Sequence, residues 1–179
     1  MINIDIFVDI FKQNKIRHDW TTLYVGLELN LIKHSDIMNY AVGFLINHPE
    51  SSNQNIILLA WGGDDIDYKS LLKNILKESH INDFKLDSNV WQFEKRKWRF
   101  GILVYIRMKH LDNYGDLLNK VTEVYADFKY PEDMESFINY LPAKDGHDSS
   151  QYSKDENVAR LINLFNDFLN KEHQYLQNQ

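Results

Sequence analysis

Apolar residues recur along most of the chain at intervals of three and four positions, the period of an amphipathic α-helix. The clearest stripe consists of Val121, Val124, Tyr125 and Phe128. A second stripe follows Pro131 and consists of Met134, Phe137, Ile138 and Leu141. Similar stripes predict helices over residues 4–11, 19–27, 35–47, 56–61, 66–76, 88–110 and 158–169. The pattern therefore predicts an all-α fold, a single-domain irregular array of about eight to nine helices.

Short polar motifs mark the expected ends of these helices. The predicted N-caps are Asp19, Ser35, and either Ser153 or Asp155. Gly62-Gly63 follows the fourth helix and precedes Asp64-Asp65, which indicates a C-cap followed by a new N-cap. A phosphate-binding loop would instead need spaced glycines after a strand. Only residues 101–106 could also form a strand, and the chain offers that strand no convincing partner.

Pro131 predicts a rigid corner between two helices. The first helix has to stop near Lys129, because proline lacks an N–H and favours extended backbone angles at Tyr130. Proline suits the first position of the next helix, whose opening turns hold Glu132, Asp133 and Glu135. Carboxylates are stabilised there by the positive end of the helix dipole. The corner is therefore expected to carry acidic groups at its rim.

Composition limits the class of protein. A chain of 179 residues with 44% hydrophobic residues is long enough for one core, so a single domain over residues 1–179 is expected. The polar run at residues 143–156 is predicted to be a flexible loop. The absence of cysteine excludes disulfides and thiolate metal sites. The start of the chain carries Asp5 and Asp9 and does not resemble a signal peptide, and no apolar stretch would span a membrane, so a cytoplasmic protein is predicted.

Charge is distributed unevenly along the chain. Residues 121–156 hold nine acids against three bases, which disfavours nucleic acid and would attract a basic protein partner. A solvated acidic face that keeps the protein soluble is the plainer interpretation. Residues 94–109 hold six bases against one acid, interleaved with aromatic residues, a pattern that can bind single-stranded nucleic acid. Because the acidic corner offers those bases a partner within the chain, no nucleic acid is predicted.

Motifs for catalysis or for cofactors are not evident. The seven histidines are dispersed, no histidine pair flanks a glutamate as in zinc hydrolases, and no G-x-S-x-G motif occurs. No metal and no cofactor is therefore predicted. Asp127 and Glu132 could meet across the corner as an acid and a base, which leaves a small hydrolase as one alternative. A structural helical domain without catalytic activity is the other.

Three segments carry a family resemblance: YADFKYPEDMESFINYLP, DWTTLYVGL and EKRKWRFGILVYI. From Asp19 to Pro142 the chain resembles an uncharacterised family of bacterial proteins with a YADF-YPED-SFI-YMP-like signature. Lys129 and Leu141 depart from that signature without affecting the corner. Some small bacterial families of this kind are encoded beside contact-dependent toxins. The resemblance thus implies an immunity protein that binds and neutralises a toxin domain.

The expected partner-binding surface combines this role with the acidic corner. The predicted binding residues are Glu123, Asp127, Tyr130, Glu132, Asp133 and Tyr140. An interaction protein should leave tyrosines accessible beside exposed acids, since tyrosines often anchor interfaces. An enzyme should show a pocket with convergent carboxylates, and a structural domain should bury its tyrosines. The sequence sets no oligomeric state.

Overall fold

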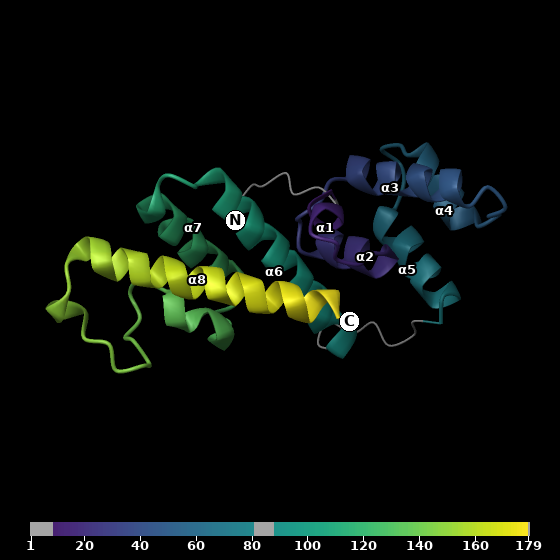
Figure 1. Ribbon diagram of the computed structural model, residues 1–179. Helices are drawn as coiled ribbons and strands as arrows, with labels where there is room; N and C mark the ends of the chain where they lie inside the picture. The colour runs from purple at the N-terminus through teal and green to yellow at the C-terminus, as the bar shows by residue number, and fades with distance from the viewer. Residues whose placement is uncertain (1–8, 81–87, 179) are drawn as a thin grey trace. The chain divides into compact units, whose positions relative to one another are not determined.

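The computed structural model describes residues 9–80 and 88–178, and this part of the chain is mainly helical and has no strand (Figure 1). Its α-helices are α1 (Asp9–Gln13), α2 (Trp20–Glu28), α3 (His34–Asn47), α4 (Gln54–Trp61), α5 (Tyr68–Glu78), α6 (Asn89–Lys109), α7 (Tyr114–Asp127) and α8 (Lys154–Gln177). Two short 3-10 helices, η1 (Glu132–Phe137) and η2 (Ser149–Gln151), lie between α7 and α8 in the chain. The predicted all-α fold is confirmed. In the first predicted helix, Ile4, Phe7 and Val8 lie outside the described residues.

The described residues form two compact units, and the boundary between the units falls within α6, after Trp98. The first unit contains α1 to α5 and the beginning of α6, whereas the second contains the rest of α6, α7, η1, η2 and α8. The number of domains in residues 1–179 stays a prediction. So does the flexibility of residues 143–156, which include η2 and the start of α8. None of the helices in the described ranges is both long and apolar enough to cross a membrane.

The core of the first unit centres on Trp98. Its indole is fully buried, meets the ring of Phe11 edge-on at 4.9 Å and donates from Nε1 to the carbonyl oxygen of Thr22 at 2.8 Å. Helix α2 passes so close that a Cβ at Gly26 would overlap the indole ring. A glycine is therefore required at this crossing of α2 and α6.

A buried ion pair lies beside that crossing. Lys97 Nζ donates to Glu94 Oε1 at 2.7 Å, and the Thr22 hydroxyl donates to Glu94 Oε2 at 2.7 Å. Both charged side chains are almost completely buried. Burial raises the pKa of Glu94, and the nearby Lys97 only partly opposes this shift. The pair is thus held in the interior by matched hydrogen bonds, and each partner depends on the other.

Of the predicted helix ends in the first unit, those at Asp19 and Gly62 are confirmed, and the N-cap at Asp64-Asp65 is wrong. Asp19 caps α2, and its Oδ1 accepts from the backbone N–H of Thr21 at 2.9 Å. Gly62 ends α4 with a φ of 68°, in the region that favours glycine. The N-cap of α5 is Asp67, which accepts from the N–H of Ser70 at 3.0 Å, and not Asp64 or Asp65.

The prediction that Ser35 caps the third helix is wrong. Helix α3 begins one residue earlier, at His34, and its N-cap is Lys33. The backbone N–H of Lys33 donates to Oδ2 of Asp36 at 2.8 Å. The Asp36 carboxylate thus satisfies the backbone N–H at the beginning of this helix. In contrast, Ser153 caps α8, and it is one of the two residues predicted for that position.

The second unit is built on the two predicted stripes. All four residues of the first stripe are buried on α7 or directly after it: Val121, Val124, Tyr125 and Phe128. Phe137 of η1 packs against Phe165 and Phe168 of α8, at ring-centroid distances of 5.4 and 5.1 Å. Helix α7 ends at Asp127, close to the predicted stop at Lys129.

The second half of the corner differs from the prediction. An α-helix was expected up to Leu141, but the chain forms the 3-10 helix η1, which ends at Phe137, and Ile138 is extended. In a 3-10 helix the side chains at i and i+3 lie above one another, so Met134 and Phe137 are buried in the core together. The predicted burial of Met134 and Phe137 is thus confirmed, although the helix that carries them is of another type.

Candidate interaction surface

The link between α7 and η1 has an unusual backbone. Lys129 and Tyr130 both have positive φ, at 66° and 57°, so Tyr130 is not extended as predicted. The N–H of Lys129 donates to the carbonyl of Ala126 at 3.0 Å, and that of Tyr130 donates to the carbonyl of Tyr125 at 2.8 Å. Left-handed residues other than glycine cost about 1–2 kcal/mol each. The chain therefore retains two strained residues at the corner.

The tyrosines of the corner are of two kinds. Tyr125 is buried, and burial together with the nearby Glu135 carboxylate raises its pKa. Tyr130 and Tyr140 are 60% and 59% exposed. The ring of Tyr130 meets that of Tyr125 edge-on at 5.3 Å, so it is supported on one side while much of its surface faces solvent. Two accessible tyrosines beside acids are what an interaction protein was expected to show.

Asp133, Glu123 and Glu132 of the predicted acidic residues have cationic partners in the chain, and those of Asp133 and Glu123 are the closer ones. Asp133 binds Arg99 of α6 through both oxygens, at 2.8 Å to Nη1 and 2.5 Å to Nη2. Glu123 accepts from Lys120 at 2.8 Å. The expectation that the bases of residues 94–109 find a partner in the corner is thus confirmed for Arg99. These ion pairs reduce the negative charge that the corner can offer to another molecule.

Glu132 extends further into solvent than either of these paired carboxylates. Its side chain is 88% exposed, more than those of Glu123 and Asp133. Lys144 lies 3.8 Å away but forms its closer ion pair, 2.6 Å, with Glu135. That hydrogen bond to Glu135 raises the pKa of Lys144.

Tyr130, Glu132 and Tyr140 are largely exposed, and we call these three residues the corner surface. Asp127, in the last turn of α7, is also exposed. Asp127 and Glu132 are exposed, and so are Glu123 and Asp133, which form ion pairs with Lys120 and Arg99. All six predicted binding residues are exposed or partly exposed, and they differ mainly in how they are paired.

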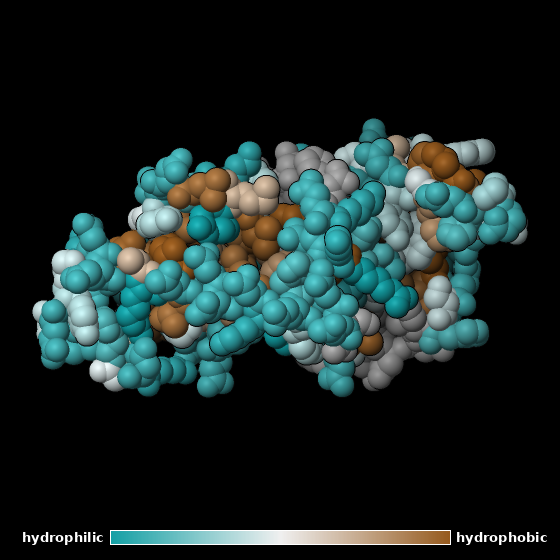
Figure 2. Space-filling view, in the orientation of Figure 1, coloured by the Kyte–Doolittle hydropathy of each residue, from teal (hydrophilic) through white to brown (hydrophobic). Residues whose placement is uncertain are grey.

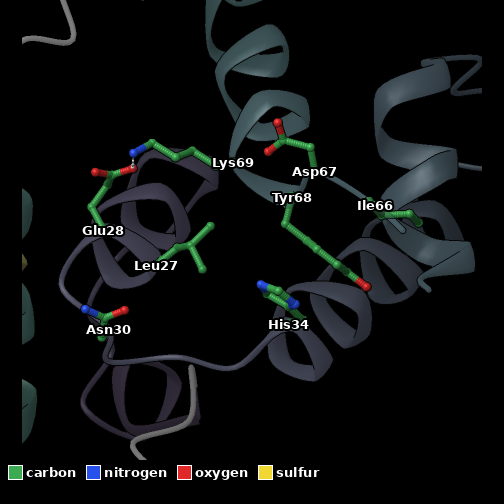
Figure 3. Close-up of a pocket in the computed structure, with 8 residues that line it drawn as sticks. All are labelled: Leu27, Glu28, Asn30, His34, Ile66, Asp67, Tyr68 and Lys69. Atoms are coloured by element: carbon green, nitrogen blue, oxygen red, sulfur yellow. Dashed lines mark ion pairs between the residues drawn. The ribbon is translucent and has the colours of Figure 1, made fainter. Parts of the chain in front are cut away.

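A pocket of about 340 Å³ lies in the first unit, away from the predicted site residues (Figure 3). Its lining comes from the end of α2, the start of α3 and the start of α5: Leu27, Glu28, Asn30, His34, Ile66, Asp67, Tyr68 and Lys69. Figure 3 shows His34 stacked on Tyr68, with ring centroids 4.0 Å apart, and Glu28 paired with Lys69 at 2.6 Å. Neither Asp127 nor Glu132 belongs to this pocket. Sequence periodicity could not find it, because three helix ends form it.

Among the described residues, no group of three or more histidine, aspartate or glutamate side chains could hold a metal ion.

A family model described as an uncharacterized protein conserved in bacteria, DUF2247, matches residues 8–173. The chain belongs to the DUF2247 family. The resemblance inferred from the signature is confirmed, and it extends beyond Pro142 through most of α8. No curated protein and no solved structure matches this DUF2247 chain.

The strained link of this DUF2247 protein leads to a stability prediction. Replacing Lys129 by glycine should raise the free energy of unfolding by about 0.5–1 kcal/mol, because glycine adopts positive φ without steric cost. Urea unfolding followed by circular dichroism measures the change. Ala126→Gly, an exposed position within α7, is the matched control and should lose about as much stability. A destabilised Lys129→Gly variant would contradict the assignment of strain to this residue.

Proposed function

We propose that this protein is a protein-interaction module that binds a basic protein partner at the corner surface. The observation that supports the proposal is the pair of exposed tyrosines, Tyr130 and Tyr140, that flank the exposed carboxylate of Glu132 in the sequence of the corner. Tyrosine provides a large contact area with a polar tip and only two rotatable side-chain bonds, so it loses little entropy on binding. A partner's lysine or arginine can then pair with Glu132.

The rigid backbone around the corner favours the same role. Tyr130 is held by its backbone hydrogen bond to Tyr125 and by the Tyr125 ring. Asp133 is fixed by both of its bonds to Arg99. A surface that is already ordered before binding keeps more of its contact energy as affinity. Strain that persists at an exposed site is typical of functional positions.

Within this class, an immunity protein that neutralises a bacterial toxin is the specific function we propose. The family resemblance suggested it, and the acidic rim of the corner suits a toxin domain with cationic groups. Glu132, Asp127 and Asp133 would meet those cations, with Glu132 contributing more than Asp133 because it is more exposed. The pocket in the first unit does not support the hydrolase alternative, since it contains neither Asp127 nor Glu132.

The test uses the gene that lies next to this one. We expect its product to inhibit bacterial growth when expressed alone, and co-expression of this protein to restore growth. The triple variant Tyr130→Ala, Glu132→Arg, Tyr140→Ala should lose protection and weaken binding by at least about a hundredfold, since central interface residues dominate affinity. Asp112→Arg, an exposed carboxylate in the α6–α7 loop, is the control for charge reversal.

One result would overturn the proposed binding site, and another would overturn only the immunity role. If the triple variant folds, as judged by circular dichroism, and still protects cells fully, the corner surface is not the binding site. If the neighbouring product binds the protein through the corner surface but is not toxic, the interaction function stands and the immunity role fails. The second result separates the general proposal from its specific form.

A further inference from the structure

The pair of helices α3 and α4 exposes several large apolar side chains. They are Val42, Ile46, Leu58 and Trp61. Trp61 is 79% exposed and Ile46 is 73% exposed, values that are unusual for such large apolar residues. Figure 2 shows apolar side chains gathered over these two helices. Clustered apolar groups of this kind on a surface mark interaction sites.

These side chains form two neighbouring stripes. Val42 and Ile46 are one turn apart on α3, and Leu58 and Trp61 are one turn apart on α4. The helices pack against each other, and Gly62 at the end of α4 lies against Met38 near the start of α3. Because the end of one helix meets the start of the other, the two run antiparallel. This arrangement brings Val42 and Leu58 to a similar level along the helix pair.

The segment that forms this face carries only negative formal charge when its histidines are neutral. Residues 34–67 contain five acidic residues and no lysine or arginine: Asp36, Glu50, Asp64, Asp65 and Asp67. All of them except Asp36 are exposed. Asp64 and Asp65 follow Trp61 within four positions, so carboxylates border the largest exposed apolar side chain. A partner that covers this apolar face therefore needs apolar side chains at its centre and basic groups at its edges.

We propose that the α3–α4 face binds a cationic amphipathic helix of a partner protein. The apolar side of such a helix would cover the four side chains of the two stripes, while lysines or arginines at its edges would pair with Asp64, Asp65 and Glu50. This is the helix-on-apolar-face mode of recognition, in which an exposed tryptophan is a frequent anchor. Charge complementarity identifies the occupant as basic.

The same charge argues against other occupants. An anionic bilayer or nucleic acid would be repelled by the five carboxylates of residues 34–67. A second copy of this chain would bring a second set of the same carboxylates against the first. The proposal does not rest on the corner surface: it involves other residues in another unit, and either site can fail without the other.

The experiment uses two tryptophan-free peptides of about 18 residues, long enough for five helical turns. One has leucines on one face and lysines on the other, and the second has the same composition in scrambled order. Calorimetry should show micromolar binding of the amphipathic peptide and none of the scrambled one, with affinity falling as salt rises. Acrylamide quenching should show that Trp61 becomes protected, since the other tryptophans, Trp20, Trp91 and Trp98, are already partly or fully buried.

Variants test whether the binding is at this face. Trp61→Ala should weaken peptide binding by about tenfold or more, and Asp64→Asn with Asp65→Asn should weaken it and reduce its salt dependence. Met108→Ala is the matched control, because Met108 is 57% exposed on α6. Four outcomes would overturn the proposal: no binding of the amphipathic peptide, equal binding of the scrambled peptide, unchanged affinity of Trp61→Ala, or a dimer in sedimentation that Trp61→Ala dissociates.

Discussion

Replacing Lys97 by methionine should lower the free energy of unfolding by about 3–5 kcal/mol, the usual cost of leaving one member of a buried ion pair alone. Methionine fills a similar volume, so the loss would come mainly from charge and not from packing. Glu94 would keep its bond from Thr22 but lose the ammonium group that lies 2.7 Å away. Chemical denaturation at neutral pH measures the effect.

The pH dependence of that variant follows from the direction of the pKa shift. Burial raises the pKa of Glu94 above its ordinary value near 4.5, and removal of Lys97 raises it further. Such a group contributes stability that is present below its ordinary pKa and is lost as the pH rises through the raised value. The deficit of Lys97→Met should therefore shrink towards about pH 4.

A double variant separates charge from packing. Glu94→Gln combined with Lys97→Met keeps an acceptor for Thr22 and removes both charges, so it should recover most of the lost stability. A double variant less stable than Lys97→Met alone would show that the ion pair is not the source of the effect.

Replacing Phe137 by alanine should cost about 3–5 kcal/mol, the range for truncating a fully buried aromatic side chain. The ring packs against Phe165 and Phe168 and is 1% exposed, so its removal leaves a cavity between η1 and α8. Thermal or urea unfolding measures the loss. Tyr140→Ala, at a nearby and largely exposed aromatic position, is the control and should change stability by less than about 0.5 kcal/mol. A Phe137→Ala variant as stable as the wild type would contradict the packing described for η1.

The two variants together also test the number of domains. Lys97 lies in the first unit and Phe137 in the second. If the chain is one cooperative domain, both substitutions lower the same transition. If the units unfold separately, each substitution should lower a different transition, and the prediction of a single domain over residues 1–179 would be wrong.

The parts of the fold that depend on local periodicity were predictable. The stripe on α7 follows from spacing alone, because burial on one side of a helix repeats every 3.6 residues. For α6 the pattern also allowed a strand at residues 101–106, and the lack of a partner strand favoured the helix. The type of helix after Pro131 was not predictable. Met134, Phe137 and Ile138 are buried, and residues three and four apart share one face of an α-helix, so their spacing predicts the burial but does not reveal the tighter helix.

The candidate site was predictable in composition but not in pairing. Acidic residues at residues 121–135 are visible in the sequence, whereas the bidentate bond of Asp133 to Arg99 joins positions 34 apart. The left-handed backbone at Tyr130 opposes the ordinary preference before proline, so it had to come from tertiary contacts. The exposure of Trp61 was missed because an apolar stripe looks the same whether it is covered or not. The sequence does show that residues 34–67 contain no lysine or arginine, and this gap in basic residues sets the segment with α3 and α4 apart.

That gap in basic residues has a practical consequence for mapping the protein. Trypsin cuts after lysine and arginine, and none occurs between Lys33 and Lys69, so the whole of α3 and α4 leaves a digest as one fragment. Amine-reactive cross-linkers would find no lysine side chain on that helix pair and would leave its contacts undetected. Labelling of carboxyl groups, followed by cleavage at aromatic residues, would instead detect contacts made by α3 and α4.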